Sequence, residues 1–173
     1  MTIYYGGMGV GEGFSPATSY TVSTSTPEYP GAPLAVGTHL HGSDGSTWVF
    51  CVAGGSITAN DAVLVTTNSS WTVQAMTSTL AKGKLGQRAG IAGATATSGQ
   101  YLWVQTAGYN SSVNAVTGAT AFTVLHSSAT AGRLTATAVG GTSAAVTGIV
   151  ILATAASNTA AAFITGAAIG ADD

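Results

Sequence analysis

Apolar and polar residues alternate in short runs along most of this chain, and Gly or Asn/Ser breaks separate the runs. A period of two places successive side chains on opposite faces of a β-strand, and short runs bounded by turn residues are typical of strands. The breaks recur about every 8 to 15 residues, which is the spacing of a small β-barrel or sandwich. The pattern predicts strands at 46–53, 61–67, 71–76, 88–97, 100–108, 121–127, 133–139, 145–155 and 161–170.

The alanine-rich end of the chain fits two kinds of element. Residues 161–170 have the alternation of a strand, whereas the overlapping segment 158–168, NTAAAFITGAA, also fits one short helix. Alanine has the highest helix propensity, so composition alone leaves both readings open. The fold class expected is all-β in either case.

Residues 1–35 differ from the rest of the chain. They contain all four prolines, which fix φ and remove backbone donors, so this segment does not fit the middle of a sheet. We therefore expect an extended N-terminal arm at 1–35, followed by one β-barrel domain at 36–173. Aromatic rings favour an arm that docks on another surface, and the candidate anchors are Tyr4, Tyr5, Tyr20 and Tyr29.

Charged residues make up 6 % of the 173 residues, and the formal net charge is −2. This balance offers no general attraction to nucleic acid or to anionic lipid, so we expect neither as a partner. The longest apolar run, at 148–156, is far shorter than the roughly 20 residues that a membrane helix needs. We therefore predict a soluble protein whose surface is suited to contact with other proteins.

Cys51 is the only cysteine, so no disulfide forms within the chain. Its apolar neighbours, WVFCVA, predict a buried structural thiol rather than a reactive one. The N-terminus has neither a basic region nor an apolar segment of a secretory signal.

Few residues are suited to catalysis or metal binding. His39 and His41 share one face of a strand, and Asp44 follows them, but a zinc site needs a further donor and His126 is the only other histidine. No acidic pair has the spacing of a general acid and base. We expect no metal, no cofactor and no enzymatic activity; a small hydrolase or lyase that uses His39 and His41 is a rival hypothesis.

A basic loop holds three of the four cationic residues, Lys82, Lys84 and Arg88, in the segment AKGKLGQRAG at 81–90. Gly83 and Gly86 favour a turn, and the segment lies between two strand patterns. One interpretation is an exposed loop that only solvates the protein, and the other is an electrostatic contact with an acidic surface.

Three stretches, read together, resemble phage head decoration (cement) proteins. They are GTHLHGSDGSTWVFCVAGGSITANDAVLV at 37–65, LGQRAGIAGATATSGQYLWVQTAG at 85–108, and LHSSATAGRLTATA at 125–138. The resemblance implies a non-enzymatic homotrimer on the outer surface of the bacteriophage capsid. It also implies that the arm at 1–35 becomes ordered against the major capsid protein.

A receptor- or glycan-binding domain of a phage fibre or spike is the alternative, because such domains are also rich in β-strands, Thr, Ser and Gly. Exposed aromatic side chains near Trp71 or Tyr109 in a concave site would favour it.

Overall fold

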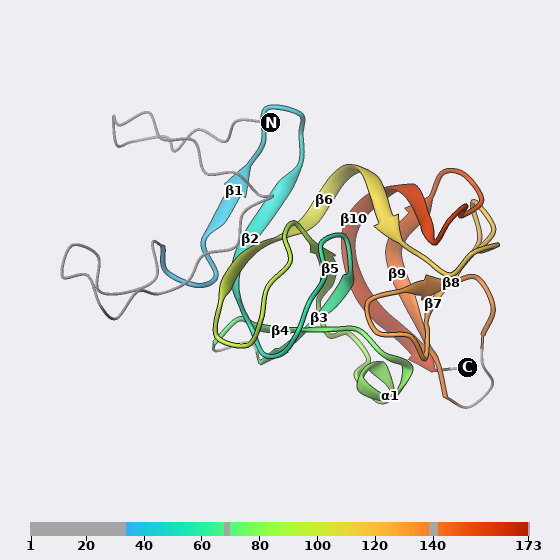
Figure 1. Ribbon diagram of the computed structural model, residues 1–173, viewed down its shortest axis with the longest axis horizontal. Helices are drawn as coiled ribbons and strands as arrows, with labels where there is room; N and C mark the ends of the chain where they lie inside the picture. The colour runs from blue at the N-terminus through green and yellow to red at the C-terminus, as the bar shows by residue number, and fades with distance from the viewer. Residues whose placement is uncertain (1–33, 68–69, 139–141, 173) are drawn as a thin grey trace.

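The computed structural model describes residues 34–67, 70–138 and 142–172, and its regular secondary structure is almost entirely β-strand (Figure 1). The elements are β1 (His39–His41), β2 (Thr47–Ala53), β3 (Ala62–Thr67), β4 (Thr72–Ala75), α1 (Ser78–Ala81), β5 (Ala89–Ala92), β6 (Tyr101–Asn114), β7 (Leu125–Ser127), β8 (Leu134–Thr135), β9 (Ala144–Ile151) and β10 (Thr159–Asp172). The predicted all-β class is confirmed.

Five strands close into a barrel in the order β2-β4-β3-β5-β6, and pairing of β2 with β6 completes the ring. β2 and β4 run parallel, whereas the other neighbours in the ring are antiparallel. Of the two architectures that the sequence allowed, barrel and sandwich, the barrel is therefore confirmed. Closure leaves these strands without a free edge within the ring.

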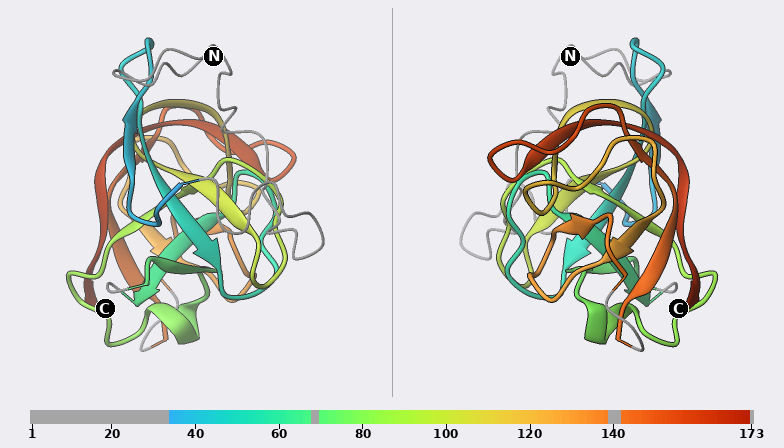
Figure 2. Two further views of the ribbon diagram at one scale, coloured as in Figure 1. Left: turned by 90° about the vertical axis from the view of Figure 1, so that its left-hand side faces the viewer. Right: turned by 90° about the vertical axis from the view of Figure 1, so that its right-hand side faces the viewer.

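A second sheet continues from the barrel because β6 belongs to both. β6 pairs with β2 from Tyr101 to Ala107 and with β10 from Ala107 onward, so the change of partner falls next to Gly108. Gly108 has a φ of 99°, and a Cβ there would lie 2.7 Å from the Cα of Ser46. β9, β7 and β8 follow β10 in order. Figure 2 shows β10, in red, as a long curved strand.

Two hydrophobic cores lie on the two sides of the barrel wall. Small and branched residues fill the barrel, among them Val49, Cys51, Val63, Val73 and Leu102. The opposite faces of β3 and β5 pack against the second sheet in a larger core, which includes Leu64, Ile91, Leu125, Ile151 and Ile164. β3 and β5 are thus buried on both faces, which explains their continuous apolar runs.

A third cluster covers the outside of β2 and β6. Trp48, Phe50 and Trp103 pack there with Leu40, and Leu34 lies against them. The ring centroids of Phe50 and Trp103 are 5.0 Å apart. Leu34, where the described chain begins, therefore already belongs to the folded body.

The structure corrects several of the expected element boundaries. The helix considered for 158–168 is wrong, because residues 159–168 lie in β10, which pairs with β6 and β9. Ala160 and Ala162 point into the core while Phe163 points out, which is the alternation of a strand. The strand expected at 121–127 begins only at Leu125, and of the described residues 133–138 only Leu134–Thr135 form a strand.

α1 is a single turn, capped at its start by the Thr77 hydroxyl, which accepts a hydrogen bond from the Leu80 amide at 3.1 Å. Within 34–67, 70–138 and 142–172, no helix has the length and apolar character to cross a bilayer. The arm expected at 1–35, with Tyr4, Tyr5, Tyr20 and Tyr29, lies outside the described residues except for Leu34 and Ala35.

Candidate functional site

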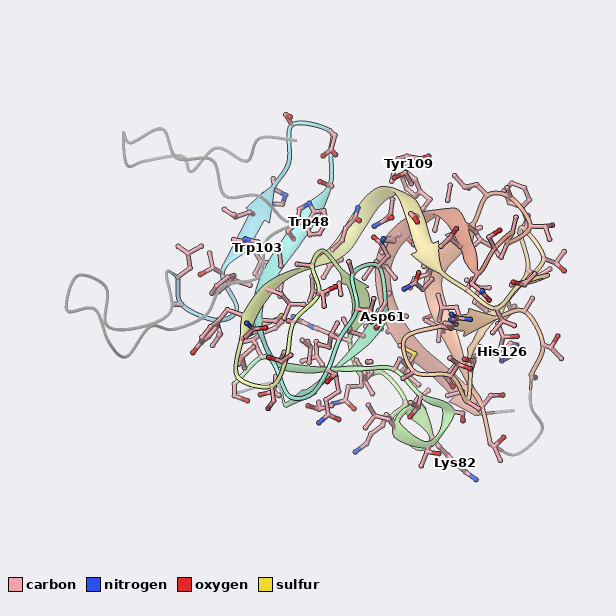
Figure 3. The ribbon with its side chains drawn as sticks, in the orientation of Figure 1. Trp48, Asp61, Lys82, Trp103, Tyr109 and His126 are labelled. Carbon is pink, nitrogen blue, oxygen red and sulfur yellow. The ribbon has the colours of Figure 1, made fainter. Side chains whose placement is uncertain are left out.

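The most prominent surface feature is a row of exposed apolar side chains across three strands of the second sheet. Tyr109 on β6 pairs with Phe163 on β10, and Phe163 pairs with Val150 on β9. Because residues in register share one face of a sheet, these side chains lie side by side. They are 53 %, 48 % and 39 % exposed. Figure 3 shows Tyr109 on the outside of the body.

Three further apolar residues extend this row. Leu152 follows the end of β9, and its amide donates to Ala161 O of β10. The Phe122 amide donates to Ile151 O at 3.1 Å, and Val124 directly precedes β7, which pairs with β9. Phe122 and Val124 are 73 % and 62 % exposed. We call the whole set the outer face: Tyr109, Phe122, Val124, Val150, Leu152 and Phe163.

The strands that carry the outer face are almost without charge. Apart from Asp172, the last residue of β10, neither β6, β9 nor β10 contains a charged residue. The solvent side of an antiparallel sheet is normally polar. A contiguous apolar patch of this kind marks a contact surface. The outer face can therefore bind apolar protein surface, but it has no group for acid–base or nucleophilic chemistry beyond the Tyr109 hydroxyl.

A second feature is a pocket of about 410 Å³ between the barrel and β10, lined by His39, Val49, Trp71, Arg88, Val104 and Ala168 among others. The Arg88 guanidinium lies 5.3 Å from the centroid of the Trp71 ring, and His39 meets the same ring edge-on at 5.8 Å. Cation–π contact fixes the guanidinium at the pocket wall. The pocket thus combines apolar walls with one aromatic ring and one cation, a composition typical of small ligand sites.

His39 does not form a metal site with its neighbours. Desolvation, followed by the positive charge of Arg88 and then His41, lowers the pKa of His39 below its usual value. His41 Nδ1 lies 3.2 Å from Thr47 Oγ1, and Asp44 accepts hydrogen bonds from both the amide and the hydroxyl of Ser46. Among the residues that the structure describes, no group of three His, Cys, Asp or Glu side chains is placed to hold a metal ion.

His126 lies on β7 in the second sheet, whereas β1 with His39 and His41 lies at the opposite end of the body (Figures 1 and 3). The three histidines of the chain therefore do not meet.

The basic loop does not act as one cluster. Lys82 ends α1 (Figure 3), and the Lys84 amide donates to Ala81 O at 3.1 Å. The Arg88 side chain instead packs on Trp71, and the Arg88 backbone forms an isolated antiparallel β-bridge with Ala168 of β10. Sequence reasoning grouped these cations, and it did not find the pocket because Trp71 and Arg88 meet only through the fold.

Asp61 is a buried carboxylate at the junction of the barrel and the second sheet (Figure 3). Its Oδ2 accepts from the Thr58 amide at 2.8 Å, and its Oδ1 accepts from Asn114 Nδ2 at 2.9 Å. Burial raises its pKa above the usual value, although these bonds and the charge of Arg133 oppose the shift. Both oxygens are used within the fold, so Asp61 joins two elements rather than facing a substrate.

Comparison with known proteins gives no relative on which to base an assignment. No family model, no curated protein and no solved structure matches this chain.

Proposed function

We propose that this chain is a bacteriophage capsid decoration (cement) protein. In this proposal it binds the outer surface of the head, contacts the major capsid protein, and holds neighbouring capsomers together as a homotrimer without catalysing a reaction. The observation that carries the proposal is the outer face: an uncharged apolar surface on a β-sheet suits permanent burial within an assembly such as the homotrimer.

The location of the three resembling stretches also supports this proposal. The stretches at 37–65 and 85–108 include β2, β5, most of β3 and the part of β6 that belongs to the barrel. The third, at 125–138, supplies β7 and β8 of the second sheet. The resemblance therefore follows a continuous part of the fold rather than scattered loops.

The decisive experiment is binding to purified heads that lack the protein. The full chain should co-sediment with heads to a saturating copy number, and electron microscopy should show density at fixed lattice positions. A chain that lacks residues 1–33 should retain the circular dichroism spectrum of a β protein but should no longer bind heads. The reason is that the arm supplies the proposed contact, through Tyr4, Tyr5, Tyr20 and Tyr29. Absence of saturable binding by the full chain would refute the proposal.

The same assay tests the two interpretations of the basic loop. Replacing Lys82, Lys84 and Arg88 with Gln should lower occupancy most at low salt if the loop meets an acidic capsid surface. Leu85→Gln changes an exposed side chain of the same loop without changing its charge, and it serves as the matched control. Unchanged occupancy of the triple variant would leave the loop only a solvating role.

A receptor- or glycan-binding domain of a fibre or spike is the second candidate, because Trp71 lines the pocket. Arg88 and Gly37 both pack on the indole ring, which leaves less of it for stacking against a sugar. A glycan array with the full chain tests this candidate. Binding that Trp71→Phe abolishes and Trp48→Phe preserves would favour the spike, and absence of any binding would remove it.

A further inference from the structure

We propose that the outer face is the surface through which copies of this chain bind one another. This inference deepens the proposed function, which includes a homo-oligomer, by naming its interface. The occupant of the outer face is a second copy of the chain, and Phe163 lies at the centre of the contact, with Tyr109 on one side and Val150 on the other.

The size of the outer face fits an interface between proteins. We take the area of a fully exposed aromatic side chain as roughly 150–250 Å² and that of a fully exposed Val or Leu as roughly 100 Å². The exposed fractions then amount to roughly 400–550 Å² of apolar surface. A standard interface buries about 800 Å² on each partner, and about 56–65 % of that area is apolar. The outer face therefore supplies about the apolar area that one side of a standard interface needs.

The surroundings of the outer face match the arrangement of an interface core and rim. Exposed hydroxyl residues border the apolar row along the same strands: Ser111 on β6, Thr165 on β10 and Thr147 on β9. Protein interfaces have an apolar, aromatic centre and a polar border that remains accessible to solvent. Three aromatic rings in one patch also match the residues that contribute most to binding energy.

The lack of charge favours a second copy over a different protein. A partner of other sequence gains specificity and association rate from complementary charge, which β6, β9 and residues 159–170 of β10 do not offer. A side chain close to the symmetry axis of such a contact meets its own copy, so a charge at the centre of the outer face would lie near a charge of its own sign. An uncharged aromatic patch avoids that repulsion, and its rings can stack with their symmetry mates.

The position of the outer face leaves room for a separate contact with another partner. Leu34, where the described chain begins, packs beside β1 and β2, and Figure 1 shows these strands at the opposite end of the long axis from β9. Self-association through the second sheet therefore does not cover the place from which the N-terminal segment departs.

Sedimentation of the full chain across a concentration series tests the inference. The wild-type chain should form a dimer or trimer at micromolar concentration. Phe163→Lys places a charge at the centre of the contact and should weaken association at least tenfold. Leu85→Lys is the matched control, because Leu85 is 72 % exposed but lies in the basic loop, and it should associate like wild type.

Tyr109→Lys, on the neighbouring strand, serves as a second variant in case circular dichroism shows that Phe163→Lys does not fold. A monomeric wild type, or wild-type association in both folded variants, would overturn the inference. The head-binding assay separates this result from the proposed function. A self-associating chain that does not bind heads would refute the proposed function and leave the inference standing. A monomeric chain that saturates heads would refute the inference together with the homotrimer of the proposed function, but not the binding to heads.

Discussion

Gly37 lies directly against the indole ring of Trp71. A Cβ at position 37 would lie 2.7 Å from Trp71 Cδ1 and closer still to the indole nitrogen. Both residues have positive φ, 85° for Gly37 and 47° for Trp71, a conformation that a bulky side chain rarely adopts. The contact therefore holds Trp71 in place at the wall of the pocket, beside Arg88.

Gly37→Ala should destabilise the protein and displace Trp71. Gly45→Ala is the matched control, because Gly45 has a φ of 81° but no atom within 4 Å of the added Cβ. The positive φ alone should cost about 1–2 kcal/mol in either variant. The clash with Trp71 should add about 1–3 kcal/mol at position 37 only. Urea unfolding measures both costs, and equal losses in the two variants would contradict the contact.

Ionisation of Asp61 should lower the free energy of unfolding as the pH rises. Its pKa in the folded state is raised above 3.8, chiefly by burial, so the folded protein holds this proton more tightly than the unfolded chain does. The stabilisation from the protonated form is therefore present below pH 3.8 and is lost as the pH rises through the folded-state pKa. Between pH 3 and pH 7, the wild type should lose unfolding free energy relative to Asp61→Asn.

Asp44 supplies a control of opposite sign. Hydrogen bonds from the Ser46 side chain and amide lower its pKa below 3.8, so its stabilisation is present above that value and is lost as the pH falls. Wild type should therefore gain stability relative to Asp44→Asn as the pH rises, by a small amount because Asp44 is exposed. If both variants showed the same sign, the assignment of these shifts to burial and to hydrogen bonding would be wrong.

Cys51 should be inert in the native protein. It is fully buried inside the barrel, and desolvation raises the pKa of its thiol to about 12, so almost no thiolate forms at neutral pH. A disulfide reagent should modify Cys51 only as fast as the barrel unfolds. Leu85→Cys adds an exposed thiol as a positive control and should react within the mixing time. Rapid modification of native Cys51 would show that the barrel opens locally.

Trp48 and Trp103 should respond differently to replacement by Phe. Trp48 Nε1 donates to Ser46 Oγ at 2.7 Å, whereas Trp103 Nε1 is buried without a hydrogen-bond partner among the described residues. Trp48→Phe loses that bond, while Trp103→Phe removes an unsatisfied donor. We expect Trp48→Phe to cost about 1 kcal/mol more in thermal or urea unfolding. The reverse order would indicate that Trp103 has a bonding partner.

Local signals in the sequence were sufficient to locate the barrel strands. The turn at GSDGS and the aromatic, β-branched run after it predict β2, and the break SITAN correctly separates β2 from β3. The alternation of Trp71, Val73 and Ala75 predicts β4. These signals lie within a few residues of the strand that they define, so they can be recognised without knowledge of the fold.

Pairings between distant residues could not be predicted in the same way. The contact of Val52 with Tyr101, which helps to close the ring, and that of Tyr109 with Phe163, which builds the outer face, join segments about 50 residues apart. Alternation tells which residues share a face but not which strand lies beside it. The alanine-rich segment was ambiguous for the same reason, since only its register with β9 decides between helix and strand.

The continuity of β6 through both halves of the body has a mechanical consequence. A single backbone, bent at Gly108, carries the ladder of the ring at one end and that of the open sheet at the other. Loosening either half therefore disturbs register in the other, and the amide protons of both should exchange with solvent together rather than in two stages. Load applied between the barrel and the second sheet is therefore carried along β6, together with the core that β3 and β5 share with the second sheet.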